Sequence, residues 1–197
     1  MHKLERDKST SVIGIQVFRK SQLAGRDEIL FNELHGERTI SEPHAHDFFI
    51  INLFEQASGV HCIDSIPHLI GNYQVHVLFP GQVHKWDIKA GTIAYQLMVE
   101  RTFFERFAPY FRFSFTNYQN HPVIQLTESA FKLLHYEFDA IKNELKQVNS
   151  LVHLISARAA VIAAIVSREA EHTFTEFKVY QSNTRLATFN MLIDEFF

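Results

Sequence analysis

The chain has 197 residues, of which 46% are hydrophobic, and a formal net charge of -3 at pH 7. This length allows one domain with a sizeable core, or one domain with a helical appendage. Lysines and arginines are scattered along the sequence, which excludes the basic stripe of a nucleic-acid-binding surface.

The cysteine content and the hydropathy pattern bear on the compartment. A single cysteine, Cys62, excludes an internal disulfide. Residues 1–8 are too polar for a signal peptide, and the longest strongly apolar run, residues 159–166, is shorter than the roughly 18 residues that suggest a membrane span. We therefore expect a cytoplasmic protein with no membrane partner.

The first half of the chain has the pattern of a β-structure. Short segments rich in Val, Ile, Phe and Tyr are separated by glycines from about residue 12 to residue 101. This number of strands is enough for a double-sheet barrel of the jelly-roll type. Strands are predicted near residues 13–19, 28–35, 48–56, 60–64, 67–70, 74–79, 84–88 and 93–100.

Two short motifs in this region bring histidines to one side of neighbouring strands. The first is Pro43-His44-Ala45-His46-Asp47, and the second is Pro80-Gly81-Gln82-Val83-His84. Because alternate side chains of a strand lie on the same face, the histidines of both motifs can converge with the apolar residues that follow them. The predicted site inside the barrel consists of His44, His46, Phe48, Ile50, His84 and Trp86.

Each of these residues also has an ordinary structural interpretation. His44 and His46 could lie at the mouth of the barrel and hydrogen-bond to loop carbonyls, and Trp86 could belong to the core. We expect the remaining histidines to be exposed or hydrogen-bonded locally, because none has a partner at metal-ligand spacing. These include His61, His68, His76 and His135.

Helical signals dominate the second half, where glycine is absent after Gly91. Residues 102–105, Thr-Phe-Phe-Glu, form a capping box that predicts a short helix ending near residue 111. A loop and a possible last strand at residues 123–126 follow. Longer helices are predicted at residues 128–148, 150–171 and 183–197.

The apolar pattern of the two long helices favours a homodimer. The first helix repeats apolar residues at alternating spacings of three and four, which is typical of a seam between paired helices, although the chain's own barrel or next helix could cover it equally well. The second is apolar on every side over residues 159–166, which calls for cover on all sides. The predicted interface residues are Phe131, Leu134, Phe138, Ile141, Ile162 and Ile165.

Three segments resemble the amino-terminal cupin domain of AraC-type transcription regulators. They are residues 43–49 (PHAHDFF), 59–64 (GVHCID) and 78–86 (LFPGQVHKW), in this order and at this spacing. The similarity continues through residues 100–104, and the helices up to Phe197 resemble the linker and dimerisation region of that family.

The resemblance implies a cupin-like barrel over residues 1–126 and a helical linker and dimerisation region over residues 127–197. In the family, the barrel senses a small molecule, and a separate pair of helix-turn-helix units reads DNA. That pair is absent from this chain, so we expect DNA to be a partner only through a further domain.

One departure from the metal-binding cupins bears on the chemistry. Those proteins are expected to have a carboxylate four or five residues beyond the His-x-His pair, where this chain has Ile50 and Ile51. His44, His46 and His84 could still hold Zn²⁺, because three imidazoles with an open position are a known zinc site. The missing carboxylate nevertheless predicts that the chain holds no metal and no other cofactor.

Two functions remain open at this stage. The expected one is a ligand-sensing and dimerisation domain that is not an enzyme and binds its effector inside the barrel. The alternative is a cupin enzyme, such as a metal-dependent dioxygenase or a sugar isomerase. The missing carboxylate and the long carboxy-terminal helices favour the first function.

Overall fold

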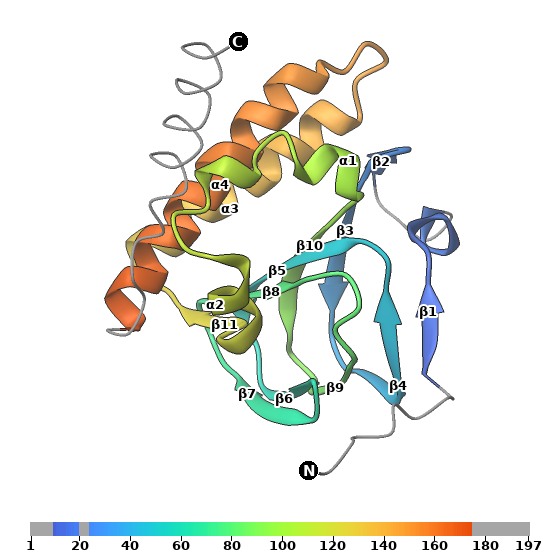
Figure 1. Cartoon of the computed structure of the whole chain (residues 1–197), viewed down its shortest axis with the longest axis vertical. Coiled ribbons are helices and arrows are strands. Elements are labelled where there is room, and N and C mark those ends of the chain that lie inside the picture. The colour runs from blue at the N-terminus through green and yellow to red at the C-terminus, as the bar shows by residue number, and fades with distance from the viewer. Residues whose placement is uncertain (1–9, 20–23, 175–197) are drawn as a thin grey trace, which may run out of the picture.

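The computed structural model describes residues 10–19 and 24–174, so the helix predicted at residues 183–197 lies outside the described part. Two sheets face each other and form a double-sheet barrel (Figure 1). The five-stranded sheet has the order β1 (Ser11–Ile13), β4 (Arg38–His46), β9 (His84–Ile88), β6 (Gly59–Ile63) and β7 (Ile66–Ile70). The six-stranded sheet has the order β11 (Val123–Gln125), β8 (Gln74–Leu78), β5 (Phe49–Gln56), β10 (Ile93–Val99), β3 (Ile29–His35) and β2 (Ala24–Arg26).

Three parts of the strand prediction were wrong, among them the edge strand β2, which was not predicted. The strand predicted at residues 13–19 is the short β1 followed by a 3-10 helix, Ile15–Val17. The longest strand, β4, was missed because most of it is exposed and polar, so its first six residues carry no buried alternation. It ends in the Pro43-His44-Ala45-His46 motif, which lies on a strand as its alternation predicted.

The segment after the barrel also differs from the prediction. Helix α1 (Arg101–Phe104) has Glu100 as its N-cap, so Thr102, the predicted cap, lies inside the helix and the predicted capping box does not form. A 3-10 helix, Ala108–Tyr110, follows. The region expected to be a loop contains α2 (Phe115–Asn120), where the Ser114 side chain accepts a hydrogen bond from the Asn117 amide.

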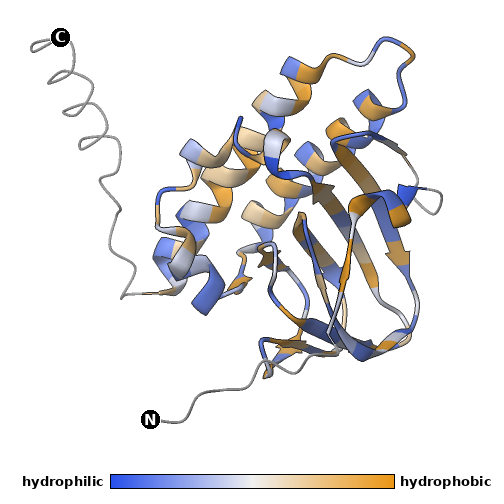
Figure 2. Cartoon of the chain, turned by 45° about the vertical axis from the view of Figure 1, so that its right-hand side comes forward, coloured by the Kyte–Doolittle hydropathy of each residue, from blue (hydrophilic) through white to orange (hydrophobic). Residues whose placement is uncertain are grey.

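Two long helices, α3 (Glu128–Leu145) and α4 (Val152–Thr173), cover the outer face of the six-stranded sheet (Figure 1). Thr127 caps α3 by accepting a hydrogen bond from the Ala130 amide at 3.2 Å. Both helices carry hydrophobic and hydrophilic residues (Figure 2), with an unbroken apolar run at residues 159–166 of α4. No helix of the described part is both long and apolar enough to span a membrane.

Strand β5 carries apolar residues on both faces from Phe49 to Phe54, interrupted only by Asn52. Ile51 and Leu53 pack against the helices in the larger core, whereas Ile50 and Phe54 belong to small clusters inside the barrel. A strand that is covered on both faces loses the alternation of a half-exposed strand. The sheet between the barrel and the helices is therefore buried on both sides.

The six predicted interface residues lie in the core of this single chain, which corrects the sequence-based argument. None of them exposes more than 8% of its surface, and α3 and α4 pack against each other and against the sheet. The two helices and the sheet cover these side chains within the single chain, so they do not supply a free apolar surface. The corrected residues are Phe131, Leu134, Phe138, Ile141, Ile162 and Ile165.

Candidate functional site

A cavity of about 280 Å³ opens between the two sheets. It contains five of the six residues predicted from the sequence: His44, His46, Ile50, His84 and Trp86. The sixth, Phe48, is buried behind the wall, with its ring 4.6 Å from that of His46. The other lining residues are Ser11, Ile13, Phe18, Asn32, Arg38, Ile40, Glu42, Gln96 and Met98.

The pairing of β4 with β9 brings the two histidine motifs together. His44 lies opposite His84, and Ile40 lies opposite Trp86, with an irregularity in β4 between these two pairs. Pro43 falls within this irregularity, where a residue without an N–H does not interrupt a ladder hydrogen bond. The result is a cluster of imidazoles from His44, His46 and His84, whose nearest ligand atoms all lie within 4.8 Å of one another.

The histidine cluster continues into a buried relay. His46 Nε2 lies 2.9 Å from His84 Nε2, and His84 Nδ1 lies 2.9 Å from His61 Nε2. His61 Nδ1 then lies 2.9 Å from His76 Nδ1, and His76 Nε2 lies 3.2 Å from Gln74 Oε1. We call His46, His84, His61 and His76 the histidine relay; it runs across the barrel from the cavity to β8.

Burial keeps the relay uncharged at neutral pH. Desolvation lowers the pKa of His46 to about 4, that of His76 to about 3 and that of His84 to about 2. The pKa of His61 is also far below its ordinary value, mainly through burial and then through the neighbouring His76. Each ring therefore carries one N–H and one lone pair.

A second polar row crosses the floor of the cavity. Asn32 donates to Gln96 Oε1 at 2.9 Å, and Gln96 donates to Asn52 Oδ1 at 2.7 Å. These residues are direct neighbours on β3, β10 and β5. Amide side chains in such a row offer both donors and acceptors to a polar molecule in the cavity.

The buried indole N–H of Trp86 indicates that the cavity holds an occupant. Its side chain is 5% exposed, and its indole Nε1 makes no hydrogen bond to any residue that the structure describes. A buried donor without a partner costs about 1–3 kcal/mol. A ligand or a water molecule with an acceptor atom would satisfy it.

The three clustered histidines fit a resident metal ion poorly. The 2.9 Å contact between His46 Nε2 and His84 Nε2 is a hydrogen bond, so one proton already occupies the space between two of the three candidate ligand atoms. His44 uses Nδ1 to bond the Glu42 carbonyl at 3.1 Å, which leaves only its Nε2 for another partner. Three neutral imidazoles also provide no negative charge to compensate a divalent cation.

Sequence reasoning missed several residues of this site. His61 and His76 were expected to be exposed or locally satisfied; both are fully buried and hydrogen-bonded, so exposure was the wrong alternative. The parity of β6 places His61 on the same side as Ile63, which is the signal that could have identified it. Identifying Asn32, Gln96 and Arg38 as lining residues would have required knowledge of which strands are neighbours.

Comparison with known proteins clarifies the fold. The solved structure of the AraC-like transcriptional activator CuxR resembles 73% of this chain, with a TM-score of 0.51 and 12% identity. The barrel has the cupin fold. The chain spans about half of CuxR, 52% of its length.

Other solved structures match a smaller share of the chain. A cupin protein from Bacteroides fragilis matches 37% of this chain and 64% of its own, with 13% identity and a TM-score of 0.32. KdgF from Halomonas sp. matches 40% and 74%, with 12% identity and a TM-score of 0.35. No protein-family model and no curated protein matches this chain.

Proposed function

We propose that this chain is the ligand-sensing and dimerisation part of an AraC-type transcription regulator, with a small-molecule effector bound inside the cupin barrel. The observation that carries the proposal is the cavity, which combines an apolar wall, a floor of amides and the unpartnered Trp86 donor. The similarity of 73% of the chain to the structure of an AraC-like activator supports it. DNA binding would belong to a domain outside this chain.

The size and lining of the cavity limit the effector. Ligand pockets usually have volumes of about 300–1,000 Å³, and this cavity of about 280 Å³ is at the lower end. Arg38 and Glu42 add one charge of each sign at its edge. The effector is therefore a small molecule with polar groups on at least two sides.

Dimerisation would use the exposed side of α4 rather than its buried side. Leu154 and Val161 are 37% and 43% exposed. Ala157 and Ala164 are exposed between and beyond them, at spacings of three, four and three. Such a stripe is the pattern of a seam between two helices, and a second copy of the chain would cover it.

A cupin enzyme is the second candidate, because three convergent imidazoles and a relay behind them could also serve acid–base chemistry. The three clustered histidines are not accompanied by a carboxylate, and this favours the ligand-sensing function over the enzyme.

The experiment that tests the proposal uses the single tryptophan of the chain, Trp86, as a reporter. We expect one member of a small-metabolite library to change its fluorescence saturably and to be recovered chemically unchanged. An Ile50→Phe variant, which fills the cavity, should abolish the response, whereas Leu69→Phe on the exposed strand β7 should not. Conversion of the bound compound into a product would favour the enzyme instead.

A further inference from the structure

The histidine relay has two possible hydrogen-bond directions. In a row of neutral imidazoles, each ring donates to one neighbour and accepts from the other, so reversing one ring requires reversing all of them. The relay of His46, His84, His61 and His76 is therefore a two-state element. Its direction is decided by the groups at its ends.

Backbone groups determine the orientation of the amides at the far end. Gln125 Nε2 lies 3.1 Å from the Asn72 carbonyl and 3.0 Å from the Tyr73 carbonyl, and only an NH₂ group can donate to both. Gln125 Oε1 consequently faces Gln74 Nε2 at 3.3 Å. The Gly71 amide donates to Gln74 Oε1 at 2.8 Å, which independently requires oxygen at that position.

This orientation propagates through the relay. Because Gln74 Oε1 can only accept, His76 must carry its proton on Nε2 and present a lone pair at Nδ1. His61 then donates from Nδ1 and accepts at Nε2, so His84 donates from Nδ1. His84 Nε2 is left as an acceptor toward His46 at the wall of the cavity.

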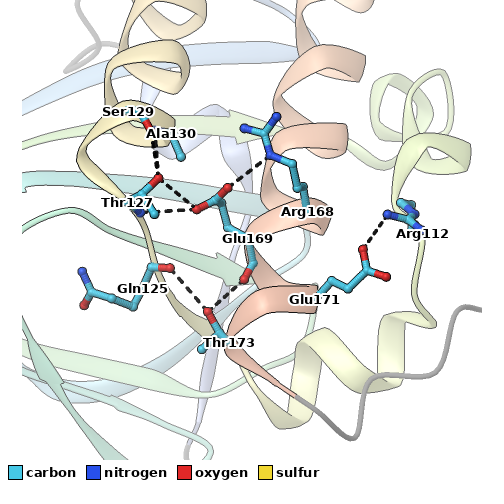
Figure 3. A network of polar contacts seen from close by, with 9 residues as sticks. All are labelled: Arg112, Gln125, Thr127, Ser129, Ala130, Arg168, Glu169, Glu171 and Thr173. Carbon is cyan, nitrogen blue, oxygen red and sulfur yellow. Dashed lines mark hydrogen bonds and ion pairs between the residues drawn. The ribbon is translucent and has the colours of Figure 1, made fainter.

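We propose that Gln74 sets the direction of the histidine relay, and that the relay thereby couples the cavity to strand β11 and the helices beyond it. Gln125, which holds Gln74, is the last residue of β11. Its carbonyl accepts a hydrogen bond from Thr173 Oγ1 of α4 at 3.4 Å, and Thr127, two residues later, caps α3 (Figure 3).

The coupling works in both directions. A ligand group that places an acceptor against His84 favours the reversed relay. In the reversal each shared proton moves one ring toward His76, His46 Nδ1 takes up a proton from the cavity, and His76 Nε2 releases its proton to solvent and has none to offer Gln74 Oε1. The Gln74 and Gln125 amides would then have to rearrange at the junction with the helices. This consequence rests on the proposed function for the nature of the occupant, but the direction of the relay does not.

The test reads the protonated nitrogen of each histidine directly, without a ligand. In ¹⁵N-labelled full-length chain at neutral pH, two-bond ¹H–¹⁵N correlation spectra should show His84 protonated on Nδ1 and His76 on Nε2. A Gln74→Met variant removes the acceptor, so a fraction of His84 should move to the Nε2-protonated form. Gln74→Glu keeps an acceptor-only oxygen and should retain the wild-type state.

Two further variants complete the design. Gln147→Met, beyond the end of α3, controls for the substitution itself and should change no histidine signal. If Gln74→Met does not fold, Gln125→Met, which frees the Gln74 amide to turn over, should produce the same shift to a smaller extent. His84 protonated on Nε2 in the wild type, or a folded Gln74→Met protein with unchanged His84 signals, would overturn the proposal while leaving the effector-binding experiment unaffected.

Discussion

The Nε2 atoms of His46 and His84 lie 2.9 Å apart, so a proton joins two of the three nitrogens that a metal ion would use. We therefore predict that the purified chain holds no stoichiometric metal, because three neutral imidazoles and a shared proton compete poorly for a divalent cation. Elemental analysis is the measurement. One zinc or nickel per chain, lost in a His84→Ala variant, would contradict this and favour the enzyme.

The buried relay predicts a loss of stability in mild acid. The pKa values of His46, His76 and His84 in the folded chain are about 4, 3 and 2, below the ordinary value of 6.5. Below about pH 6.5 the unfolded chain thus binds protons that the folded chain excludes, and stability falls as the pH drops. Each such histidine contributes a slope of up to about 1.4 kcal/mol per pH unit.

Urea unfolding between about pH 7 and pH 5 measures this slope, before most carboxylates begin to titrate. A His76→Phe variant should show a smaller pH dependence, by up to about 1.4 kcal/mol per unit. His153→Gln, at an exposed position of α4, controls for the removal of a histidine. Equal slopes for His76→Phe and the wild type would show that the relay does not govern acid stability.

Neighbouring residues of α4 distinguish the dimer seam from the core. Val161 is 43% exposed, whereas Ile162 is fully buried. Val161→Glu should convert a dimer into a folded monomer, because it places charge in the proposed seam. Ile162→Glu should instead destabilise the chain by on the order of 3–5 kcal/mol, because it buries an unpaired carboxylate.

Light scattering together with thermal unfolding separates these two effects. A wild type that remains monomeric at high concentration would remove the proposed dimer. So would a dimer that Val161→Glu leaves unchanged.

Glu169 joins α4 to the start of α3 and predicts a further stability effect. Its carboxylate is 5% exposed and accepts from the Thr127 amide and hydroxyl, both at 3.3 Å, and from Arg168 at 3.2 Å (Figure 3). Glu169→Ala should lower the free energy of unfolding by about 1–3 kcal/mol, since it removes the hydrogen bonds that this buried carboxylate accepts from Thr127 and Arg168.

Glu171 offers a matched control for that variant. It pairs with Arg112 at 2.7 Å, but both side chains are more than 40% exposed. Exposed ion pairs contribute about 0–1 kcal/mol, so Glu171→Ala should have a small effect on urea unfolding. Similar losses for the two variants would show that burial of Glu169 adds nothing.

The sequence by itself determined the fold class and five of the fourteen residues that line the cavity. Strand alternation identified His44, His46, Ile50, His84 and Trp86 as facing one interior, and all five line the cavity. Alternation is a local property, because successive side chains of any strand point to opposite faces. It predicts which residues share a face without knowledge of the neighbouring strands.

Only the tertiary structure decided which distant segments contact one another. The relay needs His61 of β6 beside His84 of β9 and His76 of β8, a meeting of two sheets that no spacing in the sequence encodes. The same holds for Ile162, whose apolar pattern could not reveal whether a partner or the chain itself buries it. A hydrophobic period in the sequence predicts that one face of a helix is covered, whereas the packing of distant segments decides what covers it.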